Sequence, residues 1–280
     1  MSLLDRLLVL PQYLAPQHAL SRLVRWATRQ SWSTPLIAPF CRRFRVDLSE
    51  AARPLSDYRS FNDFFTRRLK EGARPMAASA AQLCCPADGA VSQLGSVDGG
   101  RLIQAKGRDF SVASLLGGVD SYSAPLLEGR FITLYLSPRD YHRVHAPCDF
   151  RATELRFIPG DLFSVNDRTA RTVPNLYARN ERLVLLGTSP WGPMAYVMVG
   201  AMLVGSMSLE GYALEALAEQ ATTLEKRVLS PALAYAQGAE VGRFNMGSTV
   251  ILVLPAGSPP WLSALQPGRA VRMGELLASR

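Results

Sequence analysis

Histidine and cysteine are both scarce in this sequence of 280 residues. Its four cysteines form no C-x-x-C pair and no evenly spaced framework, so the sequence predicts neither a zinc site nor a set of structural disulfides. We expect reduced thiols, with the adjacent Cys84 and Cys85 buried in a strand. The other two are Cys41 and Cys148.

Two of the three histidines, His142 and His145, stand three positions apart. On a helix they would share one face and could hold a metal ion together. Pro138 and Pro147 bracket this segment and favour an extended conformation, in which residues three apart point to opposite faces. The third histidine, His18, is distant in the sequence, and no spacing identifies carboxylate ligands. We therefore predict no metal site.

The sequence also lacks a convincing signal peptide and a clear transmembrane helix. Asp5 and Arg6 interrupt the N-terminus, and the apolar stretch from Leu7 to Leu10 is too short for a signal peptide. An uncharged stretch from Gly192 to Leu209 is barely of spanning length and contains Pro193 and glycines, which disfavour a helix. We interpret it as two buried strands. These absences predict a protein that is not exported and lies in a reducing compartment.

The composition is that of a folded globular protein, with 48% hydrophobic and 19% charged residues. Length alone allows one or two domains. A formal net charge of +8 indicates an acidic partner, and nucleic acid, anionic lipid or simple solubility would each account for it. The sequence contains no internal repeat or low-complexity tract.

The N-terminal region, residues 1–58, has the pattern of amphipathic helices. Apolar residues recur at helical spacing, prolines at 11 and 16 interrupt them, and arginines accompany them. The apolar faces could pack against the protein's own core or lie on an anionic membrane surface, which the arginines would suit. The apolar residues are Leu3, Leu7, Leu10, Leu14, Leu20, Leu23, Val24 and Ala27, and the arginines are Arg6, Arg22, Arg25, Arg29, Arg42 and Arg43.

Residues 59–280 are typical of a β-rich domain. Strand-like runs at 131–136, 196–199 and 250–254 are bounded by glycine and proline, without the alternating helices of parallel units. Ser60 can cap a helix whose apolar face extends to Leu69, and short helices are expected at 111–116 and around 213–227. The predicted fold class is α+β, with a mainly antiparallel β barrel or sandwich and N-terminal amphipathic helices.

The bond between Gly247 and Ser248 precedes the apolar run at 250–254, which places it in a turn that leads into a buried strand. Gly-Ser is common in ordinary turns. The serine hydroxyl can also reach the preceding carbonyl carbon through a five-membered ring, and glycine leaves that carbonyl unshielded. An ester would replace the amide, and loss of the serine α-proton would expel the glycyl carboxylate. Hydrolysis of the resulting dehydroalanine would leave a pyruvoyl group, an electrophilic ketone.

Further motifs follow one another along nearly the whole chain. They are Phe64–Leu69, Arg74-Pro75, Pro86–Gly89, Gln104–Gly107, Leu136–Pro147, Pro159–Asn166, Asn180–Arg182 and Gly247–Thr249. With these motifs in this order, the chain resembles the phosphatidylserine decarboxylase family. Met246 stands where the family usually has leucine, a residue of similar volume. Asp149-Phe150 stands where the family commonly has a glycine, which affects the shape of the adjacent loop.

The resemblance implies how the site is built. Cleavage of this zymogen after Gly247 would give residues 1–247 and residues 248–280, the second carrying a pyruvoyl group derived from Ser248. His145 would deprotonate the Ser248 hydroxyl while Asp88 is hydrogen-bonded to its other ring nitrogen, as in a hydrolase triad. His142 would assist protonation after carbon dioxide leaves. From local sequence alone, Asp88 is a turn residue and His145 a structural one.

The implied reaction is the decarboxylation of phosphatidylserine to phosphatidylethanolamine in phospholipid biosynthesis, through an imine (Schiff base) between the lipid amine and the pyruvoyl carbonyl. The implied partners are phosphatidylserine, an anionic membrane surface at the cytoplasmic face, the two associated fragments and a second copy in a homodimer, with no nucleic acid. Phe163, Ser164 and Asn166, or residues 200–206, could contact the headgroup. Two hypotheses stay open beside this one: an unprocessed serine hydrolase or soluble amino-acid decarboxylase, and a non-catalytic lipid-binding β domain.

Overall fold

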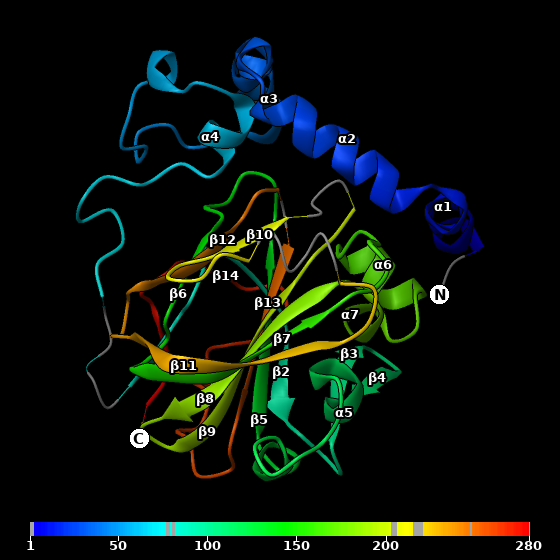
Figure 1. Ribbon diagram of the computed structural model, residues 1–280, viewed down its shortest axis with the longest axis vertical. Helices are drawn as coiled ribbons and strands as arrows, with labels where there is room; N and C mark the ends of the chain where they lie inside the picture. The colour runs from blue at the N-terminus through cyan, green and yellow to red at the C-terminus, as the bar shows by residue number, and fades with distance from the viewer. Residues whose placement is uncertain are drawn as a thin grey trace.

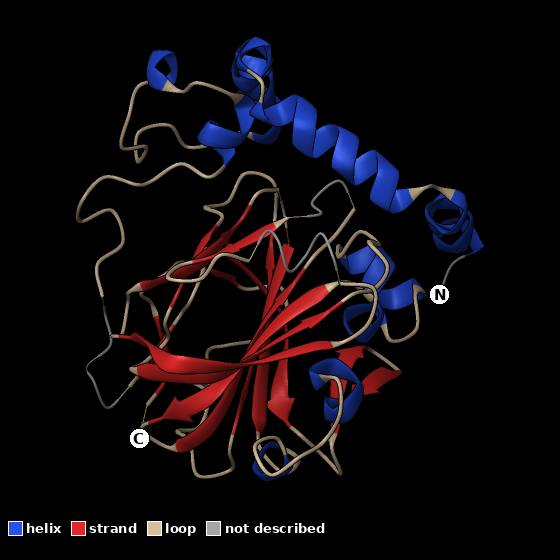
Figure 2. Ribbon diagram, in the orientation of Figure 1, coloured by secondary structure: helices blue, strands red, loops and turns tan. Residues whose placement is uncertain are grey.

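The computed structural model describes residues 3–76, 79, 82–202, 206–214, 221–246 and 248–279. Helices of the N-terminal region lie along one end of a body built mainly from strands (Figure 1). Figure 2 shows the same division by secondary structure, with the strands gathered beneath these helices. The predicted α+β class is confirmed.

The N-terminal region forms three helices joined by short turns. They are α1 (Leu3–Leu14), α2 (Gln17–Arg29) and α3 (Ile37–Phe44), with 3-10 turns η1 (Ser31–Leu36) and η2 (Leu55–Asp57). Pro11 lies inside α1, whereas Pro16 separates α1 from α2. The amphipathic pattern therefore predicted α1 and α2 correctly, and of the two prolines only Pro16 separates them.

Helix α4 (Phe61–Phe65) follows, and its start was predicted from the sequence. The Ser60 hydroxyl accepts a hydrogen bond from the backbone N–H of Asp63 at 3.1 Å, which confirms the cap. The helix ends at Phe65, short of the predicted Leu69. Residues 68–70 leave the helix because they pair with the backbone of residues 50–52, and Leu69 forms a bridge to Ala51.

Eight strands form the main sheet, and each hydrogen-bonded pair in it is antiparallel. The two edge strands of this sheet, β11 and β14, are not paired with each other in the described structure. The sheet is therefore open, and the barrel alternative is not confirmed. In spatial order the strands are β11 (Glu225–Tyr235), β7 (Phe150–Ile158), β8 (Arg182–Ser189), β9 (Gly192–Val199), β13 (Ser248–Leu254), β5 (Arg130–Leu136), β2 (Gly89–Ser96) and β14 (Ala270–Val271).

Smaller elements cover the two faces of this sheet. One face packs against a three-stranded sheet of β10 (Met207–Leu209), β12 (Glu240–Phe244) and β6 (Arg143–His145). The other packs against α5 (Val112–Leu116), α7 (Leu176–Arg179) and 3-10 turn η3 (Ala124–Leu126). The remaining elements are α6 (Asp167–Thr172) and the strand pairs β1 (Leu83–Cys84) with β15 (Leu276–Ala278) and β3 (Arg101–Ala105) with β4 (Arg108–Ser111).

Strand β13 shows why the sheet is buried on both faces. Val250, Leu252 and Leu254 join the core beneath the three-stranded sheet, whereas Ile251 and Val253 join the core beneath the helices. Successive side chains of a strand point to opposite faces, so an unbroken apolar run is what a central strand of a two-sided sheet requires. The strand predicted at 250–254 is confirmed as part of β13.

Other expectations had mixed outcomes. The short helix predicted at 111–116 is confirmed as α5, and Ser111 is its N-cap, because its hydroxyl accepts the N–H of Ser114 at 3.0 Å. The helix predicted around 213–227 is wrong for every residue of it that the structure describes: 213–214 and 221–224 are non-helical, and from Glu225 onward β11 pairs with β7, which overrides local helix propensity. Residues 215–220 lie outside the described structure. All four cysteines are buried and unpaired. No helix among the described residues has both the length and the apolar content to cross a bilayer.

Candidate active site

The register of the main sheet brings three predicted regions to one edge. Ser248 is the first residue of β13 and pairs with Leu136, the last residue of β5. On the far side of β5, Ala90 pairs with the adjacent Tyr135. Asp88 precedes β2 by one residue and therefore lies at the same edge as Ser248, two strands away.

A glycine fixes how closely Asp88 approaches this edge. A Cβ atom at Gly89 would lie 2.3 Å from the backbone oxygen of Tyr135, so only glycine allows β2 to meet β5 here. The glycine of this Asp-Gly pair is therefore required by the packing of β2 against β5. Gly247, the other half of the predicted cleavage site, lies outside the described residues.

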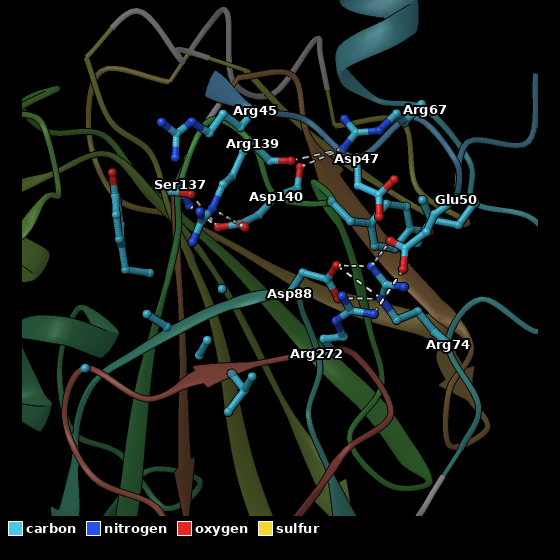
Figure 3. Close-up of a pocket in the computed structure, with 18 residues that line it drawn as sticks. Arg45, Asp47, Glu50, Arg67, Arg74, Asp88, Ser137, Arg139, Asp140 and Arg272 are labelled. Atoms are coloured by element: carbon cyan, nitrogen blue, oxygen red, sulfur yellow. Dashed lines mark hydrogen bonds and ion pairs between the residues drawn. The ribbon is translucent and has the colours of Figure 1, made fainter. Parts of the chain in front are cut away.

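Asp88 is held by cationic and backbone donors. The Arg74 guanidinium donates to its carboxylate through Nε at 2.9 and 3.1 Å and through Nη2 at 2.5 Å, and the Met273 N–H donates at 2.9 Å. Arg74 also donates to Glu50 at 2.7 Å, and Arg272 donates to the other Glu50 oxygen at 3.0 Å. The carboxylates and guanidiniums form one compact network (Figure 3).

His145 lies close to this network but does not contact Asp88. Its Nδ1 lies 2.8 Å from the Gly238 oxygen, which only accepts, so Nδ1 carries the proton and Nε2 accepts from the Tyr141 hydroxyl at 3.1 Å. Burial lowers the pKa of His145. The predicted hydrogen bond between Asp88 and His145 is therefore not formed. A neutral imidazole competes poorly with the charged Arg74 for a carboxylate, which explains the difference.

His142 is fully buried and has an unused ring nitrogen. Its ring stacks on Phe65 with centroids 4.2 Å apart, and Nε2 lies 3.1 Å from the Ser137 oxygen, to which it donates. Nδ1 has no partner. Burial, with the charge of Arg67, lowers the pKa of His142 to about 3, so the ring is neutral at pH 7. The His142 carbonyl accepts the N–H of Phe244, four residues before Ser248, at 3.0 Å.

The two histidines thus occupy different positions relative to Ser248. The segment is extended, as predicted, and β6 begins directly after His142. His142 pairs with the end of β12 that leads to Ser248, whereas His145 pairs with Glu240 at its other end. Among the described residues, no three His, Cys, Asp or Glu side chains cluster in a way that could hold a metal ion.

Two neighbouring cavities open at this edge of the sheet. The larger, of about 520 Å³, contains Asp88 and Ser137 (Figure 3). The smaller, of about 260 Å³, contains His145. Arg74 and Tyr141 line both and so form the wall between them. The polar residues of the larger cavity are Arg45, Asp47, Glu50, Arg67, Arg74, Asp88, Tyr135, Ser137, Arg139, Asp140, Tyr141 and Arg272.

Sequence reasoning missed the residues that organise these cavities. Arg67, Arg74 and Tyr141 all fall within the recognised motifs, but nothing local assigned them a role. Two proposed headgroup residues serve elsewhere. The Ser164 N–H binds the Gln12 side chain of α1, and Phe163 packs in the core beneath the helices.

The remaining headgroup candidates are Asn166 and residues 200–206. Asn166 caps α6 by accepting the Thr169 N–H at 3.0 Å. Within 200–206, residues 203–205 lie outside the described structure. None of Phe163, Ser164 and Asn166 lines the cavity that contains Asp88.

The chain is similar to known proteins over nearly its whole length. A family model described as phosphatidylserine decarboxylase matches residues 61–279, and a second, described as PSD, matches residues 7–45. A phosphatidylserine decarboxylase proenzyme of Methylibium petroleiphilum is 47% identical over 278 residues, covering 98% of each chain. Proenzymes with the same name from Ectopseudomonas mendocina and Pseudomonas aeruginosa are each 47% identical, covering 98% or more of both chains.

These matches define the chain as an enzyme of the lyase class, a decarboxylase made as a proenzyme. It belongs to the phosphatidylserine decarboxylase family, as the motifs predicted.

Proposed function

We propose that this chain is the precursor of a pyruvoyl-dependent enzyme that converts phosphatidylserine to phosphatidylethanolamine. The names of its relatives support the substrate. The observation that carries the chemistry is the register that starts β13 at Ser248, at the sheet edge where Asp88 and the polar cavity lie.

Processing would begin when the Ser248 hydroxyl loses its proton and attacks the Gly247 carbonyl carbon. The peptide C–N bond then breaks and leaves an ester and a free amine. Removal of the Ser248 α-proton expels the Gly247 carboxylate, and water converts the remaining enamine to the pyruvoyl group with release of ammonia. The products are residues 1–247 and 248–280, the latter of 280 − 247 = 33 residues.

The two fragments would remain together because the smaller one contributes strands to the sheets. β13 lies between β9 and β5, while β14 and β15 pair with β2 and β1 of the larger fragment. Five apolar residues of β13, from Val250 to Leu254, are fully buried. Separation would expose these side chains and break both ladders.

We assign the predicted roles as follows. His145, supported by Asp88, deprotonates Ser248, and His142 protonates the substrate carbanion. For this role, Nε2 of His145 has to exchange the Tyr141 hydroxyl for that of Ser248. The unpartnered Nδ1 of His142 and its closeness to Phe244 favour a second assignment, in which His142 is the base. Separate variants of the two histidines distinguish these assignments.

The surroundings of position 248 fit a polar prosthetic group. Buried polar atoms without partners occur at the Thr249 hydroxyl, at His142 Nδ1 and at the Arg67 guanidinium. The ketone would bind the substrate amine and take up the electrons released with carbon dioxide, which is the task of an electron sink. Arg67 lines the cavity and His142 contacts the backbone oxygen of Ser137, another cavity residue. We propose that Arg67 holds the substrate and that His142 returns a proton.

The N-terminal helices provide a surface for the lipid bilayer. Val9 is buried in the core beneath the helices, and Gln12 and Gln17 bind the loop at 162–164, so the helices are attached to the body. Large apolar side chains nevertheless remain exposed, with Leu14 81% and Trp26 57% exposed. We propose that this surface, with its arginines, binds anionic lipid at the cytoplasmic face as a peripheral contact. Further exposed apolar side chains of this surface are those of Leu7, Leu8, Leu10, Leu20, Leu23, Trp32 and Leu36. The homodimer stays a prediction, which sedimentation would test.

Intact mass measurement tests the proposal directly. Wild type is expected to give two fragments, with the smaller lacking a free α-amino group, and Ser248→Ala one chain. Ser248→Thr is expected to be cut poorly, because the additional methyl crowds the ring closure. Carbon dioxide is expected from phosphatidylserine vesicles and not from free serine. An intact wild-type chain with hydrolase activity would support the first alternative hypothesis, and lipid binding without either activity the second.

A further inference from the structure

The cavity at the Ser248 edge is divided into a neutralised part and a cationic part. Its lining contains five arginines and four carboxylates, so it carries an excess of one positive charge when all are ionised. Arg74 pairs with both Glu50 and Asp88, and Arg272 pairs with Glu50, so two arginines are balanced by two carboxylates. Figure 3 shows this cluster on one side of the cavity, with Arg45 and Arg139 on the other. The uncompensated charge therefore belongs to the second side.

Arg67 is the buried member of this cationic side. It is 3% exposed and has no carboxylate within ion-pairing distance among the described residues. Its Nη2 donates to the backbone oxygens of Arg139 and Asp140 at 3.1 and 3.3 Å, while Nε and Nη1 have no partner. Burial lowers the pKa of Arg67. A buried guanidinium with unused donors is unfavourable unless an acceptor is supplied, and Arg67 is one of the residues that line the cavity.

Arg45 and Arg139 add donors on the same side. Arg45 ends α3 in a left-handed conformation with φ 56°, and it forms no ion pair within the described part of the chain. Arg139 is held at its backbone by Arg67, and its side chain makes one long contact of 3.7 Å with Asp140. Both side chains are thus available to a ligand in the cavity.

The other two carboxylates of the cavity make their shortest hydrogen bonds with serines. Asp140 accepts from the Ser137 N–H at 2.6 Å and its hydroxyl at 2.7 Å. Asp47 accepts from the Ser49 N–H at 2.9 Å and its hydroxyl at 2.6 Å. These carboxylates shape the adjoining turns, which leaves the guanidinium donors for an anion.

This cationic side lies next to the cleavage site. Ser137 lines the cavity and directly follows Leu136, the backbone partner of Ser248. Tyr135, which also lines the cavity, pairs with Thr249. The backbone partners of Ser248 and Thr249 thus lie beside or among the residues that line this cavity.

We propose that Arg67, Arg139 and Arg45 bind the phosphodiester of the substrate headgroup. This inference rests on the proposed function for its substrate. A guanidinium offers paired donors that match phosphate oxygens, and its charge is retained even where it is buried. In phosphatidylserine the phosphodiester is separated from the reacting α-carbon by only a methylene and an oxygen, so the two can occupy adjoining positions.

The substrate carboxylate is a poorer occupant. Its negative charge disperses as carbon dioxide forms, so a guanidinium bound to it would stabilise the ground state more than the transition state and slow the reaction. The phosphodiester keeps its charge throughout. Arginines that bind it contribute equally to both states and act on substrate affinity.

Two substitutions test this site, with one matched control. Arg139→Gln removes the charge of a side chain that is 62% exposed. Arg67→Lys keeps the buried charge but loses the paired N–H donors of the guanidinium. Arg101→Gln removes an exposed arginine paired with Asp109 on a distant hairpin. Each variant is checked for cleavage by intact mass, and kcat and KM are then measured with phosphatidylserine in mixed micelles and with soluble glycerophosphoserine.

We expect KM for both substrates to rise about tenfold or more in Arg139→Gln and Arg67→Lys, with kcat within about twofold. Arg101→Gln should match wild type. Unchanged KM in Arg139→Gln would overturn the proposal, and so would a fall in kcat without a change in KM. If Arg67→Lys is not cut, Arg139→Gln still decides the question.

A binding experiment separates this inference from the proposed function. The uncut Ser248→Ala chain is titrated with glycerophosphoserine and with inorganic phosphate, with and without Arg139→Gln. We expect the diester to bind and the second substitution to weaken it, whether or not wild type makes a pyruvoyl group. Tighter binding of inorganic phosphate than of the diester would indicate a free-phosphate site and overturn the headgroup assignment, as would no binding of either.

Discussion

Replacing Arg74 by methionine isolates the energy of the network that holds Asp88. Methionine keeps most of the length of the side chain but removes every donor, so Asp88 and Glu50 lose their shared guanidinium. The Arg74 and Asp88 side chains are only 9% and 10% exposed. Removing one partner of a buried ion pair typically costs about 3–5 kcal/mol.

The lower end of that range applies here. Glu50 keeps its contact with Arg272, and Asp88 keeps the Met273 N–H. We therefore expect a loss of about 3 kcal/mol, which lowers the melting temperature by roughly 6 °C or more in a chain of this size. The measurement is best made in the Ser248→Ala background, so that every molecule is one uncut chain. Arg101→Met, at an exposed pair, is the control and should leave the melting temperature unchanged.

The effect should also depend on pH. The Arg74 hydrogen bond lowers the pKa of Glu50. A carboxylate with a lowered folded-state pKa contributes stability above its unfolded value, near 4.3, and loses it as the pH falls through the folded value. The difference between the Arg74 variant and its parent should thus be largest at neutral pH and shrink below about pH 4. A loss no larger than that of Arg101→Met, or one that is constant down to pH 3, would refute the reasoning.

Two further predictions concern catalysis and the membrane. His145→Ala and Asp88→Ala should slow the appearance of the second fragment by about a hundredfold or more, whereas His142→Ala should be cleaved normally but release carbon dioxide slowly. Time courses of intact mass measure the cleavage, and time courses of gas release measure the decarboxylation. The reverse pattern would make His142 the base. Trp26→Ser should weaken binding to anionic vesicles about tenfold in a flotation assay, while Ile103→Ser, which removes a similarly exposed side chain on β3, should not; equal effects would show that the helical surface is not the contact.

The sequence predicted those parts of the fold that depend on neighbouring residues. Ser60 and Ser111 mark helix starts because a cap is formed within three residues. The apolar run at 250–254 marks a strand buried on both faces. β11 was missed because its strand conformation depends on pairing with β7, more than sixty residues earlier, and such pairing is invisible in a local pattern.

The candidate site was predicted in composition but not in its contacts. The motifs identified Asp88, His142, His145 and Ser248 without showing what each side chain touches. Arg74 lies fourteen positions before Asp88, and neither local pattern indicates that it forms the shortest contact of that carboxylate. Competition among partners of different charge decides such contacts, and it depends on the assembled fold.

This competition has a consequence for the proposed reaction. While His145 is neutral, Asp88 stays with Arg74, and burial lowers the pKa of His145, an effect that the charge of Asp88 opposes in small part. If His145 takes the proton of Ser248, as proposed, it becomes a cation and can compete with Arg74 for the carboxylate. Asp88 would then stabilise the charged imidazole more than the neutral one, which is the difference that lowers a barrier. The absence of a hydrogen bond in the uncut chain is therefore compatible with the assigned role of Asp88, and the Asp88→Ala time course decides whether that role is real.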